Sequence, residues 1–147
     1  MVITTTRYEG DLHCRVMHEP SAAQLQTDAP VDNQGRGENF SPTDLVGAAL
    51  GSCILTTMAI VARGLQIELS GATATVEKEM ATAPTRRIAR LATHVTVPCE
   101  VEAPHRERLE AVAHRCPVHH SLHPDIDLPI TFSWGVDAPP AAEGQPT

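Results

Sequence analysis

Two of the four cysteines, Cys53 and Cys116, stand in surroundings that could support redox or nucleophilic chemistry. The thiolate form of cysteine is the nucleophile, so the neighbours that set the thiol pKa decide whether a cysteine reacts. Cys53 lies in an uncharged run, residues 45–62, where a thiol is most often an inert apolar side chain. A reactive Cys53 would therefore need a cationic or hydrogen-bonding neighbour.

Cys116 has more suggestive surroundings, because Pro117 follows it directly. We expect Cys116 to end an amphipathic helix and to cap a short helical turn at residues 117–122, whose backbone N–H groups would favour a thiolate. Nearby residues that could add positive charge or hydrogen bonds are His114, Arg115, His119 and His120. The alternative is a core cysteine at a helix end. If Cys53 and Cys116 contact each other, they form a dithiol that can cycle through a disulfide, but the sequence alone does not show that contact.

A metal site is the other chemistry to weigh for this run of residues. Soft and imidazole ligands lie close together at Cys116, His119, His120 and His123. Structural zinc sites usually take their ligands from two separated pairs, and no such second pair occurs here, so we expect no metal site. The other two cysteines, Cys14 and Cys99, fall in expected strands and are interpreted as structural.

The segment that must position Cys53 is an expected helix from Ser41 to Gly64. Ser41 is a suitable N-cap, Pro42 suits the first helical position, and Asp44 completes a capping box. A helix without a charged face must be surrounded on most sides. Its length would also suit a membrane span, but we favour a buried central helix and no membrane association, because glycine, serine and threonine dilute the run.

Gly47 and Gly51 are four residues apart and form a smooth strip on this helix. A second copy of the chain is the favoured partner for that strip, in a homodimer that buries two such helices. The alternative is that both glycines pack on the chain's own sheet.

Alternating and turn-forming patterns predict the remaining elements. Strands are expected at residues 2–8, 12–17, 22–28, 65–69 joined to 73–80 through a bulge at Gly71, 87–102 and 128–134. A mobile polar loop is expected at residues 30–39 and an amphipathic helix at residues 104–115. Because strands follow one another in hairpins, the predicted fold class is α+β with mainly antiparallel sheets.

Length and composition set the broad class of protein. The 147 residues predict one domain over residues 1–136, followed by a disordered tail at residues 137–147. A net charge of −7 with scattered arginines argues against nucleic-acid binding. The irregularly spaced cysteines and the absence of a secretory signal pattern predict a reducing, cytoplasmic location.

Two motifs together, FSPTDLVGAALGSC at residues 40–53 and AHRCPVHHSL at residues 113–122, resemble the OsmC/Ohr family of organic-hydroperoxide reductases. The resemblance covers residues 2–135 and implies an intertwined homodimer in which two sheets enclose two central helices. It implies peroxiredoxin-like chemistry in which Cys53 attacks an organic peroxide and Cys116 resolves the product as a disulfide. It also implies an antioxidant role, an external dithiol reductant of the lipoyl type, and no bound cofactor.

The sequence departs from this family at the residues that activate the thiol. The family uses a glutamate ten residues before the central cysteine, where this chain has Thr43. Asp44 lies nine residues before Cys53, on the opposite helix face and ~13 Å away along the axis, and is interpreted as the cap partner of Ser41. For the family's N-terminal arginine, Arg36 is the first candidate, with Arg15 and His18 as alternatives.

A second hypothesis follows from the missing glutamate. The chain would then be a diverged dimer of the same fold that binds a small hydrophobic ligand or senses redox state without significant turnover. The paired cysteine motifs favour the enzyme.

Overall fold

The computed structural model describes residues 1–136, and the predicted tail at residues 137–147 lies outside this range. The chain divides into two compact units, Met1–Val46 and Gly47–Thr147. The expectation of a single domain over residues 1–136 stays a prediction.

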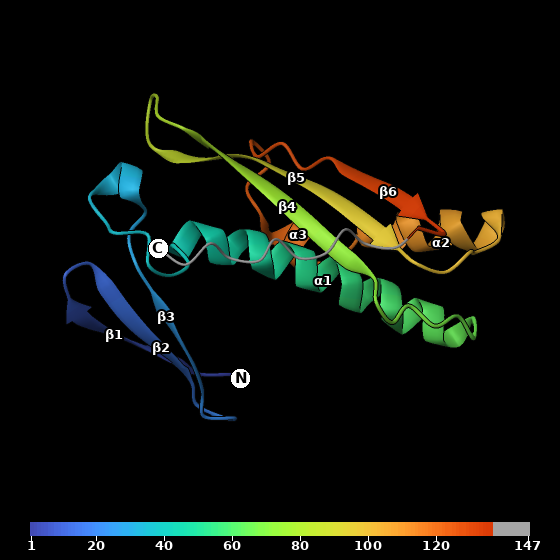
Figure 1. Cartoon of the computed structure of the whole chain (residues 1–147), viewed down its shortest axis with the longest axis horizontal. Helices are drawn as coiled ribbons and strands as arrows, with labels where there is room; N and C mark the ends of the chain where they lie inside the picture. Colours follow the sequence, from blue (N-terminus) through green and yellow to red (C-terminus); the bar gives the residue numbers. More distant parts are fainter. Residues whose placement is uncertain (137–147) are drawn as a thin grey trace. The chain divides into compact units, whose positions relative to one another are not determined.

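The first unit contains a three-stranded antiparallel sheet in the order β1-β2-β3 (Figure 1). Its strands are β1 (Thr4–Gly10), β2 (His13–His18) and β3 (Ala23–Thr27). Asp11 and Leu12 form the β1–β2 turn at φ values of 47° and 65°, the left-handed region that tight hairpins require. The predicted N-terminal hairpin and third strand are confirmed.

The polar loop after β3 is folded around one carboxylate. A short 3₁₀ helix, Val31–Asn33, begins the loop. The Oδ2 atom of Asp28 accepts hydrogen bonds from the backbone N–H groups of Arg36 at 3.1 Å and Glu38 at 3.0 Å. Sequence patterns predicted only a mobile loop here, because they do not show that Asp28 gathers its backbone.

Helix α1 (Pro42–Gly64) begins with the predicted capping box. The Ser41 backbone N–H donates to Asp44 Oδ2 at 2.7 Å, and the Asp44 N–H donates to Ser41 Oγ at 3.1 Å. These two bonds satisfy backbone donors that the first helical turn leaves without partners. The interpretation of Asp44 as the cap partner of Ser41 is therefore confirmed.

The chain leaves α1 through a tight turn, and the predicted strand at residues 65–69 is wrong. The N–H groups of Leu65 and Ile67 both donate to the Ala62 carbonyl at 2.9 Å, and Gln66 is left-handed with a φ of 58°. Alternation of apolar residues occurs in this segment because it covers the helix end.

The second unit contains a sheet in the order β4-β5-β6 (Figure 1). Its strands are β4 (Thr73–Ala81), β5 (Arg87–Val97) and β6 (Ile130–Trp134). β4 pairs antiparallel with β5, and β6 pairs parallel to β5. The predicted α+β class with mainly antiparallel pairing is confirmed.

Two details of this sheet differ from the prediction. The bulge lies at Glu79 and Met80 instead of Gly71, which is a turn residue with a φ of 86°. β5 ends at Val97, five residues earlier than expected, because Pro98 has no N–H group to continue the ladder.

The core of the second unit forms between α1, β5 and α2 (Ala103–Ala113). Apolar residues of all three elements are completely buried in this core. The residues with no exposed surface are Leu50, Ile54 and Met58 of α1, Leu91, Val95 and Val97 of β5, and Leu109 and Ala113 of α2.

The glycine strip of α1 faces the chain's own sheet, so its assignment to a second copy is wrong. A Cβ at Gly51 would lie 3.2 Å from Val76 Cγ2 and 3.5 Å from Ala74 Cβ, both on β4. A Cβ at Gly47 would lie 3.5 Å from Val76 Cγ1. Because glycine has no side chain, α1 can approach β4 closely at these two positions. Figure 1 shows β4 crossing this helix.

The opposite face of α1 is exposed and carries no charge until Arg63, in the last turn of the helix. Ile60 is 67% exposed, and the other exposed positions of this face are Ala48, Ala49, Ser52, Thr56 and Ala59. α1 is long and apolar enough to cross a membrane, with a mean hydropathy of 2.1 over its most apolar window. A core helix passes the same test, and the side of α1 that faces β4 is such a core.

Candidate active site

Helix α2 and the short helix α3 (Pro117–Ser121) position Cys116. Cys116 is the N-cap of α3, as predicted, because the residue before a proline is held out of the helical region, but α2 already ends at Ala113 and not at Cys116. Its Sγ atom accepts a hydrogen bond from the His119 backbone N–H at 3.3 Å. The side chain has no exposed surface.

The structure brings Cys53 and Cys116 together in the second unit. A side-chain hydrogen bond joins the two thiols, and the charge that Cys53 carries when ionised also acts on Cys116. Both sulfurs are free thiols, with Cys53 half-buried and Cys116 buried. The pair therefore has one sulfur that solvent can reach and one that it cannot.

The surroundings of Cys116 favour its protonated form. Burial is the main cause that raises the pKa of the Cys116 thiol, and the hydrogen bond and charge of Cys53 raise it further. The His119 backbone N–H acts in the other direction and lowers this pKa without reversing the shift. These surroundings therefore favour a protonated Cys116 thiol beside the Cys53 sulfur.

The histidine cluster beside Cys116 supplies less positive charge than the sequence suggested. Burial lowers the pKa of His119, and the neighbouring charges of His114 and His120 lower it further, so the His119 imidazole is neutral at pH 7. The ring of His119 contacts the rings of His114 and His120 edge to face, at centroid distances of 5.9 and 6.1 Å. The direct electrostatic aid to Cys116 comes from a backbone N–H group.

The three candidates for an activating cation lie in the first unit. The Arg36 guanidinium is within 3.8 Å of Asp11 and 3.9 Å of Glu38, and its side chain is 64% exposed. Such exposed pairs hold a side chain only weakly, so Arg36 can exchange one carboxylate partner for another. Arg15 is paired with Glu9 at 2.7 Å, and His18 Nδ1 bonds Ser21 Oγ at 2.6 Å.

The other two cysteines lie in ordinary structural positions. Cys14 lies in β2, opposite Tyr8 and Thr27 of the neighbouring strands. Cys99 lies just beyond β5 instead of within it, and its thiol donates to the Glu68 carbonyl at 3.3 Å.

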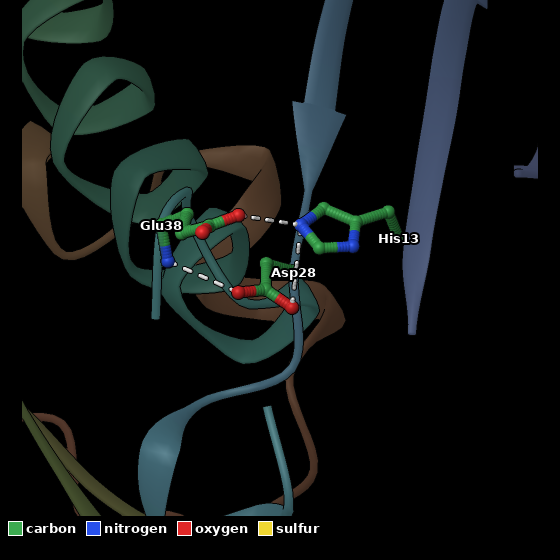
Figure 2. A group of neighbouring side chains, drawn as sticks. All are labelled: His13, Asp28 and Glu38. Atoms are coloured by element: carbon green, nitrogen blue, oxygen red, sulfur yellow. Dashed lines mark hydrogen bonds and ion pairs between the residues drawn. The ribbon is translucent and has the colours of Figure 1, made fainter. Parts of the chain in front are cut away.

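Within residues 1–136, one set of three potential metal ligands has all its ligand atoms within 4.8 Å of one another: His13, Asp28 and Glu38 (Figure 2). The run from Cys116 to His123 forms no such set among these residues. Sequence reasoning missed the cluster, because its members are 15 and 10 residues apart and match no ligand-spacing motif. Only the pairing of β2 with β3 brings His13 beside Asp28.

Comparison with known protein families identifies the class to which this fold and cysteine pair belong. The model of the OsmC family, described as OsmC-like protein, matches residues 35–131. This range includes both cysteines and most of the second unit. The chain belongs to the OsmC-like family, whose members are linked to hydroperoxide resistance and to the osmotic stress response.

Solved structures agree with this assignment. A protein of Psychrobacter arcticus 273-4 assigned to osmotic stress induction and detoxification response is 41% identical, with a TM-score of 0.86 over 90% of this chain and 96% of that one. An organic hydroperoxide resistance protein OsmC from Legionella pneumophila is 20% identical, with a TM-score of 0.74 over 90% and 96%. An organic hydroperoxide resistance protein from Elizabethkingia anophelis is 17% identical, with a TM-score of 0.74 over 91% and 96%.

The last two likenesses concern the fold alone. The comparison with curated proteins gave no match.

Proposed function

We propose that this protein is a thiol peroxidase that reduces organic hydroperoxides to alcohols through Cys53 and Cys116. The observation that carries the proposal is the direct interaction of two thiols that differ in exposure. The half-buried Cys53 can meet a substrate, whereas the buried Cys116 can meet only Cys53. This asymmetry assigns attack to Cys53 and resolution to Cys116.

In the first step, the Cys53 thiolate attacks the distal oxygen of the peroxide, and the O–O bond breaks. The sulfur gains an S–OH group, and the alkoxide takes a proton to leave as an alcohol. The Cys116 S–H group lies within hydrogen-bond reach of the attacking sulfur. Arg36 is the proposed cation for the thiolate and for the charge that develops on the leaving oxygen.

In the second step, the Cys116 sulfur attacks the Cys53 sulfenic acid, a disulfide forms, and the hydroxyl leaves as water with the Cys116 proton. An external dithiol, which we propose to be of the lipoyl type, reduces the disulfide and becomes a disulfide itself. This cycle needs no bound cofactor and suits the reducing cytoplasm, where we place the protein.

Uncharged surroundings of Cys53 favour an organic peroxide over hydrogen peroxide. No charged residue occurs in residues 45–62, and the neighbours of Cys53 one turn away on α1 are Ala49 and Thr57. Transfer of an alkyl or aryl group from water to such surroundings is favourable in free energy, whereas hydrogen peroxide has no apolar group to transfer.

Stoichiometric oxidation tests the proposal. One equivalent of cumene hydroperoxide is expected to remove two of the four thiols in each chain and to lower its mass by two hydrogens, as measured by thiol titration and intact mass spectrometry. Peptide mapping should show a Cys53–Cys116 disulfide, with Cys14 and Cys99 still alkylated. A folded protein that keeps all four thiols under these conditions would contradict the peroxidase proposal. The alternative of a ligand-binding protein would then remain, and the presence of Thr43 in place of the family's glutamate favours it.

A homodimer is the proposed assembly, with the exposed face of α1 against a second copy of the chain. This face includes Ile60 and its one charge before the helix end is Arg63 in the last turn, whereas a free surface helix normally carries charged residues along its length. A symmetric pair would enclose both copies of the helix.

Analytical ultracentrifugation is expected to show a dimer. Ile60→Asp should weaken it at least about 30-fold, the effect of losing a contact worth about 2 kcal/mol. Ala111→Asp, on the exposed side of α2, is the matched control and should leave the dimer intact. A monomer in the unaltered protein would rule out the assembly.

A further inference from the structure

Three side chains from separate segments of the first unit meet at one point. His13 lies at the start of β2, Asp28 directly follows β3, and Glu38 comes from the loop before α1. His13 Nε2 is 3.7 Å from Asp28 Oδ1 and 3.2 Å from Glu38 Oε2. Figure 2 shows both carboxylates directed at the same ring nitrogen.

Asp28 presents one oxygen that has no hydrogen-bond donor. Its side chain is completely buried, and its Oδ2 atom is held by two backbone N–H groups. Its Oδ1 atom accepts no hydrogen bond from the described residues and faces His13. A buried carboxylate oxygen without a donor is costly unless a cation completes its surroundings.

The orientation of His13 leaves the correct atom free to bind a cation. His13 Nδ1 lies 2.8 Å from the Asp11 carbonyl, which can only accept, so Nδ1 carries the hydrogen. In the neutral ring, the lone pair is then on Nε2, which faces the two carboxylates. Metal-binding histidines are commonly fixed in this way, by a hydrogen bond from the other ring nitrogen to a carbonyl.

The two distances from His13 to the carboxylate oxygens match a first-row metal. Bonds of about 2.1 Å at tetrahedral angles place neighbouring ligand atoms about 3.4 Å apart. The two nitrogen–oxygen distances of 3.2 and 3.7 Å bracket this value. Glu38 is half exposed, which gives an ion access from solvent, and its other oxygen remains free for Arg36 at 3.9 Å.

We infer that His13, Asp28 and Glu38 form a binding site for a divalent first-row transition-metal ion, held by one imidazole nitrogen and two carboxylate oxygens. Water completes the coordination, since the chain supplies three ligands. The mixed nitrogen and oxygen donors suit Zn²⁺ or Mn²⁺ better than Mg²⁺ or Ca²⁺, which prefer oxygen ligands alone. Two carboxylates balance the charge of such an ion.

Calorimetric titration with Zn²⁺ tests the site. All proteins carry Cys53→Ser and Cys116→Ser, so that the dithiol cannot bind the ion and the outcome is independent of the proposed peroxidase. One ion is expected to bind per chain. His13→Gln and Glu38→Gln should each weaken binding at least about 100-fold, because a direct ligand contributes no less than its supporting residues.

Matched controls lie at the far end of β2 and in the turn that follows it. His18→Gln and Glu19→Gln remove a histidine and a glutamate whose partners are Ser21 and Thr5, and they should bind Zn²⁺ as the parent does. Equal affinity in His13→Gln and His18→Gln would overturn the inference, as would the absence of binding to the parent.

A second measurement covers the case in which the substituted proteins fail to fold. Mn²⁺ added to the unaltered chain, where thiols compete poorly for it, should broaden the His13 ring signals in NMR spectra before those of other histidines. Broadening that begins at His119 or His120, or that never appears, would show that the cluster is only a histidine–carboxylate ion pair.

Discussion

Cys53→Ser is expected to abolish the reduction of cumene hydroperoxide, with a loss in kcat/KM on the order of 10³-fold or more. A serine hydroxyl at this position cannot ionise in the uncharged run of α1 and cannot form a stable sulfenic-acid equivalent. The substitution is small and should leave the helix intact, since the buried positions of α1 are other residues. Peroxide consumption by the reduced protein, with a dithiol in excess, measures the effect.

Cys14→Ser and Cys99→Ser provide the matched comparison, because both remove a thiol outside the dithiol pair. Each should retain the activity of the unaltered protein within about twofold. If Cys99→Ser lost as much activity as Cys53→Ser, the assignment of the attacking sulfur would be wrong.

Cys116→Ser should separate the two steps of the cycle. The first turnover should still produce one equivalent of alcohol, because Cys53 remains. The sulfenic acid then has no resolving thiol, so steady-state turnover should fall by a factor on the order of 10² and Cys53 should advance to sulfinic acid. Rapid-quench product analysis gives the burst, and intact mass spectrometry should find the protein heavier by two oxygens.

The pH dependence of disulfide formation gives this prediction a further check. The pKa of Cys116 is raised, mainly by burial, so the fraction ionised at neutral pH is small and grows as the pH rises toward that pKa. The rate of the second step should therefore increase with pH across the neutral range, whereas Cys116→Ser shows no such step. A resolution rate that is independent of pH would indicate that another group removes the proton.

Local patterns in the sequence predicted most elements that carry the active site. The Ser41–Asp44 box, the uncharged run after it and Pro117 each act within a few residues, so their effects can be read along the chain. The strand at residues 65–69 failed for a related reason: alternation also arises where a turn covers a helix end, and periodicity does not distinguish the two cases.

Contacts between residues that are distant along the chain could not be predicted from the sequence. The interaction of Cys53 with Cys116 depends on how α1 and α2 pack around β5, and the resemblance to a family supplied it before the structure did. The glycine strip was assigned to the wrong partner, because Gly47 and Gly51 indicate close approach without naming what approaches. Prediction of the cluster at His13 requires the pairing register of β2 and β3, which the spacing of residues along the sequence does not show.

The cap of α3 links the oxidation state of the pair to local structure. Cys116 Sγ accepts the His119 N–H as a thiol, and in the proposed disulfide the same sulfur is bonded to Cys53 in place of its hydrogen. Each time the proposed disulfide forms, the group that caps the first turn of α3 therefore changes, and it changes back when the reductant opens the disulfide. We therefore expect the structure of α3 to differ between the oxidised and the reduced protein, so that a partner that binds α3 could distinguish the two forms.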